Sequence, residues 1–198
     1  MEATEESGGL RARRKRETRA ALIDAAFELF QAQGYAGTTM EEIAERAHVS
    51  RRTAFRYFPT KEGLVFPGQE GRLARFRELL AEGGGPPFET VRHACLTLAK
   101  EYMVEREHFL AQWELVQSEP TLQASELQLD REYEDAIAEV FASAERDTAK
   151  GRRRARVRAG AVLGAVRAVL RDWLEGGAEA DLGRLGREAF THLERGLG

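Results

Sequence analysis

Three arginines and one aromatic residue lie within a single short segment of the chain, and their spacing suits contacts to DNA. On a helix, Phe55 follows Arg51 by one turn, and Arg56 follows Arg52 by one turn. Arginine can bind O6 and N7 of guanine with two hydrogen bonds, and an aromatic edge can touch a thymine methyl group. The segment is therefore a candidate surface for reading base pairs.

Two short helices joined by a tight turn are expected to position these side chains. The first helix should begin at Thr39, whose hydroxyl caps it while Glu42 reaches back to complete a capping box. The second should begin after Ser50, another favoured N-cap residue, with Ala54 and Phe58 on its inner face. This pattern predicts a helix-turn-helix, whose second helix enters the major groove of DNA.

Two turn residues define the ends of the neighbouring elements. Gly34 should end the first long helix in a left-handed conformation, with Phe30 and Tyr35 in contact across the ending. His48 lies in the turn between the two short helices, where we expect a positive φ. A turn conformation accounts for this histidine better than a metal-binding or catalytic role.

Charge is distributed unevenly along a chain whose formal net charge is only -3. Residues 10–66 hold 11 Lys and Arg against 7 Asp and Glu, whereas residues 67–198 hold 19 against 23. A basic N-terminal part suits a protein that touches DNA with only one of its parts. A basic cluster precedes or opens the first helix, where it either contacts phosphates or the minor groove or is a solvated helix start. The cluster consists of Arg11, Arg13, Arg14, Lys15, Arg16 and Arg19.

The cysteine count and the N-terminal segment indicate a compartment. Cys95 is the single cysteine, so no disulfide can form within the chain, and a reducing compartment is favoured. No segment has the apolar core of a signal peptide, and no uncharged apolar run reaches the ~18 residues of a membrane span. We expect a cytoplasmic protein without membrane contacts.

Helical periodicity dominates the sequence and predicts an all-α fold of nine helices. The fourth helix should run from about Thr60 through a kink at Pro67, because proline lacks an N–H donor and crowds the preceding turn. We expect a helix-turn-helix domain over 1–66, with 1–10 disordered, and a larger domain over 67–198. The strongest break in the larger domain is the glycine and proline run at 83–87. Beyond it we expect helices near 88–105, 107–116, 120–146, 152–175 and 181–196.

The stretch from Thr18 to Leu64 resembles the TetR/AcrR family signature. It contains G-Y-x-x-T-T followed by I-A-x-x-A-x-V-S-x-x-T-x-F-x-Y-F-x-x-K-x-x-L, except that His48 stands where glycine is common. The resemblance implies a dimer of nine-helix subunits, usually a repressor. A later S-E-P-T-L is similar to a branch whose C-terminal domain is described as acyl-CoA-like ligand binding. The DNA contacts that the resemblance implies are Thr39, Arg51, Arg52, Thr53, Phe55, Tyr57 and Lys61.

The last two predicted helices combine small residues, which allow close approach, with apolar ones. We expect them to form a two-fold dimer, which would read a near-palindromic operator. The alternative is that the same residues form only the core of one chain. The candidate interface residues are Ala161, Val162, Ala165, Val169, Leu182, Leu185 and Phe190.

Apolar and aromatic residues on the larger domain's helices are candidates for a pocket that binds a small hydrophobic or amphipathic effector of unknown identity. Each of them could equally be ordinary core, because cores use the same residue types. The candidates are Cys95, Leu98, Tyr102, Phe109, Trp113, Tyr133, Ile137, Phe141 and Trp173.

Two other classes of protein remain as alternatives. A di-iron helical-bundle enzyme needs Glu-x-x-His on two helices of the bundle, but within residues 67–198 Glu105 and His108 form the single such pair. We therefore expect neither enzyme activity nor a cofactor or metal. A helix-turn-helix protein that binds DNA without any small-molecule effector is the second alternative.

Overall fold

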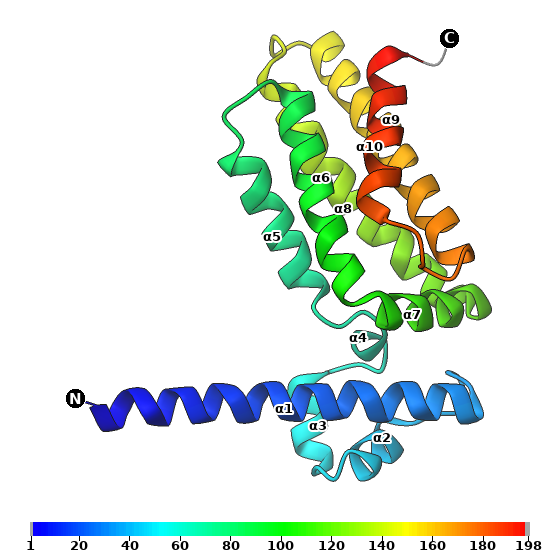
Figure 1. Cartoon of the computed structure of the whole chain (residues 1–198). Helices are drawn as coiled ribbons and strands as arrows, with labels where there is room; N and C mark the ends of the chain where they lie inside the picture. Colours follow the sequence, from blue (N-terminus) through cyan, green and yellow to red (C-terminus); the bar gives the residue numbers. More distant parts are fainter. Residues whose placement is uncertain (1, 197–198) are drawn as a thin grey trace. The chain divides into compact units, whose positions relative to one another are not determined.

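The computed structural model describes the backbone of residues 2–196 and the side chains of residue 9 and residues 11–196, and its regular structure over this range is entirely helical. Its contacts divide the chain into two compact units, Met1–Pro67 and Gly68–Gly198. The all-α class expected from the sequence is confirmed. The first unit contains α1 (Glu2–Gln33), α2 (Met40–Arg46), α3 (Arg51–Tyr57) and α4 (Glu62–Val65) (Figure 1). The second contains α5 (Gln69–Glu82), α6 (Pro87–Val104), α7 (Arg106–Ser118), α8 (Pro120–Ser143), α9 (Ala149–Glu175) and α10 (Leu182–Arg195).

Local capping interactions set the ends of the short helices in the first unit. The Thr39 hydroxyl accepts a hydrogen bond from the backbone N–H of Glu42, whose side chain accepts one from the Thr39 N–H, as expected for a capping box. The Ser50 hydroxyl caps α3 by accepting from the Thr53 N–H at 3.2 Å. His48 has φ 54°, so the expected turn conformation is confirmed.

The C-terminal end of α1 also follows the sequence. Gly34 has φ 79° and donates its N–H to the carbonyl oxygen of Phe30 at 3.0 Å, the hydrogen bond of a simple left-handed ending. The expected contact is present, with the ring centroids of Phe30 and Tyr35 5.2 Å apart.

The N-terminal end of α1 differs from expectation. We expected residues 1–10 to be disordered, whereas α1 begins at Glu2; Met1 lies outside the described residues. The basic cluster from Arg11 to Arg19 therefore lies inside α1 rather than ahead of it.

The expected kinked fourth helix is two helices. Proline at position 67 lacks the N–H that would continue α4, and Gly68 has φ 78°, a left-handed conformation that no α-helix contains. The chain therefore stops one helix at Val65 and starts another at Gln69, and over the described residues the nine expected helices become ten.

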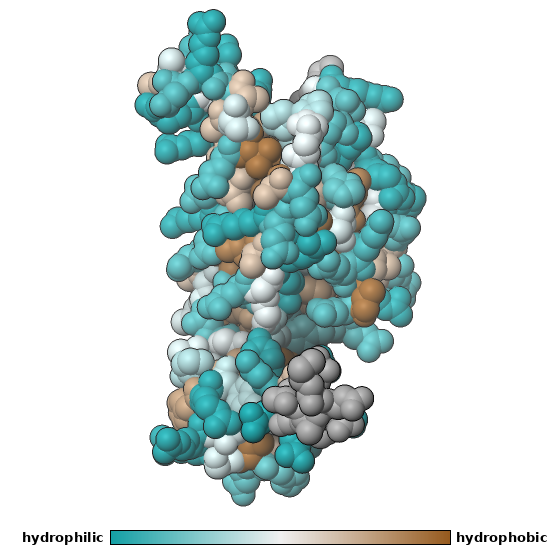
Figure 2. Space-filling view, turned by 90° about the vertical axis from the view of Figure 1, so that its left-hand side faces the viewer, coloured by the Kyte–Doolittle hydropathy of each residue, from teal (hydrophilic) through white to brown (hydrophobic). Residues whose placement is uncertain are grey.

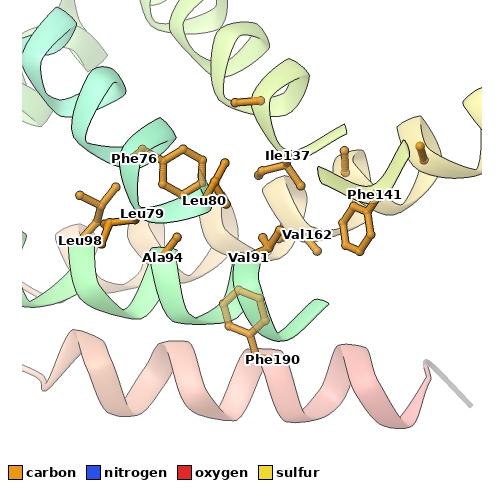
Figure 3. Packing of buried hydrophobic residues seen from close by; sticks show 13 residues of the cluster. Phe76, Leu79, Leu80, Val91, Ala94, Leu98, Ile137, Phe141, Val162 and Phe190 are labelled. Atoms are coloured by element: carbon orange, nitrogen blue, oxygen red, sulfur yellow. The ribbon is translucent and has the colours of Figure 1, made fainter. Parts of the chain in front are cut away.

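The larger core cluster of the second unit is built from five of its six helices. α9 packs mainly against α8 and α10, and α6 packs against α5 and α10. Thirteen buried hydrophobic residues from these helices form one cluster, which includes Phe76 from α5, Ile137 from α8 and Phe190 from α10 (Figure 3). Burial of this apolar area drives the packing of the unit.

Few large hydrophobic side chains of the described residues are exposed. One face of the molecule is mostly hydrophilic, with small separated hydrophobic patches (Figure 2). The exposed large hydrophobics are Phe55, Val104, Leu127 and Val157. Among the described residues, no helix combines the length and the apolar character needed to cross a membrane.

Candidate nucleic-acid interface and effector cavity

Helix α3 has an apolar inner face and a cationic outer face. Ala54 and Phe58 are 0% and 3% exposed and turn into the first unit. Arg52 and Arg56 are exposed, and Phe55 is 37% exposed although it is a large aromatic residue. The outer face therefore has the residue types that read base edges in the major groove.

Arg51 makes contacts that orient it on this face. Its guanidinium forms an ion pair with the carboxylate of Glu41 on α2 at 2.6 Å, and its Cζ lies 5.5 Å from the centroid of the Phe55 ring. Both partners of the ion pair are largely exposed, so the pair orients the arginine more than it stabilises the fold.

The other residues implied by the resemblance are half-buried or make contacts within the first unit. Thr53 and Tyr57 are half-buried, and the Thr53 hydroxyl lies 2.9 Å from that of Ser50 in the cap of α3. The exposed Thr39 hydroxyl lies 2.8 Å from the Glu42 carboxylate. The Lys61 ammonium is bound to the carbonyl oxygens of Tyr35 and Thr38 and lies over the Tyr35 ring. Lys61 thus links the start of α4 to the turn that follows α1.

The basic residues of α1 divide into free and engaged ones. Arg11, Arg14, Lys15 and Arg16 are exposed, Arg13 pairs with Glu17 at 2.7 Å, and the half-buried Arg19 lies 4.5 Å from the centroid of the Phe58 ring. Arg19 therefore packs within the first unit, whereas the other members of the cluster face solvent.

The second unit contains a partly enclosed cavity between α5, α6, α8, α9 and α10. Its empty volume is about 900 Å³, which includes a part open to solvent. Five of the predicted residues line it: Cys95, Leu98, Tyr102, Tyr133 and Ile137. Burial raises the pKa of the Cys95 thiol to about 12, and burial also raises the pKa values of Tyr102 and Tyr133.

Four of the predicted pocket residues do not line this cavity. Phe109, Phe141 and Trp173 are 7%, 4% and 1% exposed and belong to packed clusters, and Trp173 donates its indole N–H to the carbonyl oxygen of Ala180 at 2.9 Å. Trp113 is partly exposed on α7, outside the cavity wall. The structure thus brings five of the nine candidates together on one cavity wall and places these four outside it, because composition cannot separate core residues from pocket residues.

Three residues predicted for the dimer surface are buried inside one chain. Val162, Leu182 and Phe190 are each 3% exposed, and Val162 and Phe190 lie within the core cluster of Figure 3. Ala165 and Val169, together with Leu182 and Phe190, lie on the cavity wall instead. Only Ala161 of the seven is exposed, and Leu185 is half-buried. Both α9 and α10 have apolar residues on more than one face, so the sequence alone could not assign those faces.

A different stripe of α9 does face solvent. Val157, Ala161, Gly164 and Ala168 are exposed and follow one another at spacings of four, three and four residues. Such spacing places them on one side of the helix, where small residues permit close helix packing. Within the described residues, no group of three or more His, Cys, Asp or Glu side chains is arranged to hold a metal ion.

Comparison with known proteins identifies both parts of the chain. Residues 22–66 match the family described as bacterial regulatory proteins, tetR family, and residues 85–198 match the MftR C-terminal domain. The regulator TcmR of Streptomyces glaucescens is 33% identical over 153 residues, covering 72% of this chain and 67% of that protein.

Solved structures show the same fold. FadR of Thermus thermophilus, a TetR family transcriptional repressor solved in complex with lauroyl-CoA, is 28% identical with a TM-score of 0.56, over 91% of this chain and 95% of that one. FadR of Bacillus halodurans is 22% identical with a TM-score of 0.67, over 91% and 96%. The chain therefore belongs to the TetR family of DNA-binding transcription regulators, with an MftR-type C-terminal domain, and is not an enzyme.

Proposed function

We propose that this regulator is a homodimeric repressor that leaves its operator when a small hydrophobic or amphipathic molecule enters the cavity of the second unit. The observation that carries the DNA-binding part is the outer face of α3, where Arg51, Arg52 and Phe55 are exposed beside a properly capped helix start. Solvated arginines alone would not require an exposed aromatic residue among them.

The effector part of the proposal is supported by the cavity. Its wall is almost entirely apolar and draws on five helices, so an apolar ligand could be enclosed there. The similarity to FadR of Thermus thermophilus, which binds lauroyl-CoA in its solved structure, favours an acyl chain as the apolar part.

The dimer part of the proposal assigns the α9 stripe to the two-fold interface. A single recognition helix seldom supplies operator-level affinity, whereas a dimer presents two helices to two half-sites about 34–36 Å apart. The operator should therefore be near-palindromic. The stripe offers small exposed residues without a carboxylate among them.

The decisive experiment begins with selection of bound oligonucleotides from a random pool by the purified protein. A near-palindromic consensus is expected, and the double variant Arg51→Ala, Arg52→Ala should lose affinity for it by at least tenfold. Arg77→Ala, an exposed arginine of α5, is the matched control and should bind as the unaltered protein does.

A second titration tests release. Lauroyl-CoA added to the operator complex should lower its affinity, and the size of the effect should be about 5–150-fold, as is typical of coupling between two sites. Full operator affinity in the double arginine variant would reject the assignment of α3. Operator binding unchanged by lauroyl-CoA and by other apolar ligands would favour a regulator without an effector.

A further inference from the structure

Most of the cavity wall is apolar, but two tyrosines on it carry polar hydroxyl groups. Tyr102 on α6 and Tyr133 on α8 both line the cavity. Neither hydroxyl is hydrogen-bonded to another group among the described residues. These two hydroxyls on an otherwise apolar wall are places where a ligand would gain hydrogen bonds.

A cation stands next to these tyrosines at the end of an aromatic stack. The Tyr102 ring lies face to face with the Phe109 ring, with centroids 3.9 Å apart and planes inclined by 9°. The guanidinium carbon of Arg72 lies 5.1 Å from the centroid of Phe109. Such stacking of a guanidinium on a ring holds the charge in place.

Arg72 is not part of the cavity wall, but it lies close enough to both tyrosines for its charge to act on them. It precedes Phe76 by one helical turn, and Phe76 lines the cavity with its ring centroid 5.2 Å from that of Tyr133. A Cβ atom placed on Gly68, at the joint that precedes α5, would lie 3.5 Å from the Arg72 guanidinium. The cation therefore lies near both Phe109 and Gly68, on the same face of α5 as Phe76.

Arg72 makes no ion pair with any carboxylate in the described part of the chain, whereas Arg75 on the same helix pairs with Glu78 at 3.4 Å. Burial is the main cause that raises the pKa of both tyrosines, and the Arg72 charge opposes it only in part. Both hydroxyls consequently stay protonated at neutral pH and can donate hydrogen bonds. A cation and two donors together favour a negatively charged partner.

We propose that the ligand of this cavity is an amphipathic organic anion, whose carboxylate or phosphate is bound by Arg72 and the hydroxyls of Tyr102 and Tyr133 while its apolar part fills the cavity. The inference rests on the proposed effector function of the same cavity. A carboxylate, which would repel an anionic ligand, is also near. Asp130 lines the cavity, but its carboxylate forms an ion pair with Arg167 at 3.0 Å. Like Asp130, the carboxylates of Glu105 and Glu126 raise the pKa of Tyr102.

Four ligands with the same ten-carbon chain test the inference directly: decanoate, decyl phosphate, 1-decanol and decylamine. Trp173 reports binding, because it packs in a cluster with Tyr102 and with the cavity residues Leu170 and Leu182. The variant Trp113→Phe serves as the background, since it leaves Trp173 as the sole tryptophan of the two. Fluorescence titration should show an anion, decanoate or decyl phosphate, binding at least tenfold more tightly than 1-decanol.

Three variants locate the source of that preference. Arg72→Gln should bind 1-decanol as before and lose the preference for the anion, whereas Arg72→Lys should retain most of it. Arg77→Gln removes one charge from an exposed position of the same helix and should leave the preference unchanged. Whether decanoate or decyl phosphate binds more tightly identifies the anionic group.

Each remaining outcome would overturn the inference. Equal binding of 1-decanol and the anions, tighter binding of decylamine, or an anion preference that survives in Arg72→Gln would show that Arg72 does not bind the ligand. In these cases the cavity would still be an effector site. If none of the four ligands altered Trp173 fluorescence in the folded protein, the effector cavity would itself be wrong, and this inference with it.

Discussion

The ammonium group of Lys61 donates a hydrogen bond to the carbonyl oxygen of Thr38 at 2.8 Å, between residues 23 positions apart in sequence. The same ammonium is bound to the carbonyl oxygen of Tyr35 and lies 4.2 Å from the centroid of its ring. One lysine at the start of α4 therefore ties down the turn that leads from α1 into the helix-turn-helix. The resemblance implied a DNA contact for Lys61, and the structure adds this positioning role.

Replacing Lys61 by methionine should destabilise the protein, because two carbonyl oxygens lose a charged donor while the side-chain volume is kept. The expected loss is about 1–3 kcal/mol of unfolding free energy, measured by urea denaturation. Lys100→Met, at an exposed site on α6, is the control and should change stability little. Unchanged stability in Lys61→Met together with weaker DNA binding would assign Lys61 to phosphate contact alone.

The capping box at the start of α2 predicts a pH dependence. Hydrogen bonds from the Thr39 hydroxyl, from the Thr39 backbone and from Gln33 lower the pKa of Glu42 below the usual range of a glutamate. A carboxylate whose pKa is lower in the folded state stabilises the fold above the unfolded pKa, and this contribution is lost as pH falls through the folded pKa. Glu42→Gln should therefore be less stable than the unaltered protein at neutral pH, and the difference should disappear in acid.

Thermal unfolding from pH 7 down to pH 3 checks this sign. Glu45→Gln, also on α2 and exposed, has no capping role and should give a constant difference over the same range. A stability difference for Glu42→Gln that grew in acid would contradict the assigned direction of the pKa shift.

The exposed stripe of α9 predicts the site of dimerisation. Ala161→Glu introduces a charge where a second copy of the helix would pack closely, and the dimer should dissociate at micromolar concentration in sedimentation velocity. Ala74→Glu, at an exposed position of α5, introduces the same charge outside the stripe and should leave the dimer intact. Dimers that persist in Ala161→Glu would place the interface on another surface.

The cavity residue Cys95 should react slowly with alkylating reagents. Because burial raises the pKa of its thiol to about 12, almost none of it is thiolate at pH 8. Its alkylation by iodoacetamide should be orders of magnitude slower than in urea-unfolded protein and should keep rising above pH 9. Mass spectrometry follows the reaction at a single site, since the chain has one cysteine. A rate that levelled off near pH 9 would indicate an exposed, ordinary thiol.

Features that depend on neighbours in sequence were predictable from the sequence. Thr39 with Glu42 and Ser50 cap their helices as expected, since a cap needs only residues within one turn. Burial of Ala54 with exposure of Phe55 followed from helical periodicity in the same way. The TetR signature lies over these short helices, so the sequence alone was sufficient to identify the class of protein.

Features that depend on which helix packs against which face were decided only by the tertiary structure. Val162 and Ala161 are adjacent and both apolar, yet one is buried in the core of its own chain and the other faces solvent. Phe109 and Tyr102 stack on one another, but only Tyr102 lines the cavity. Periodicity tells which residues share a face of a helix. It does not tell whether that face meets the core, a cavity or a second chain, because all three bury the same kinds of side chain.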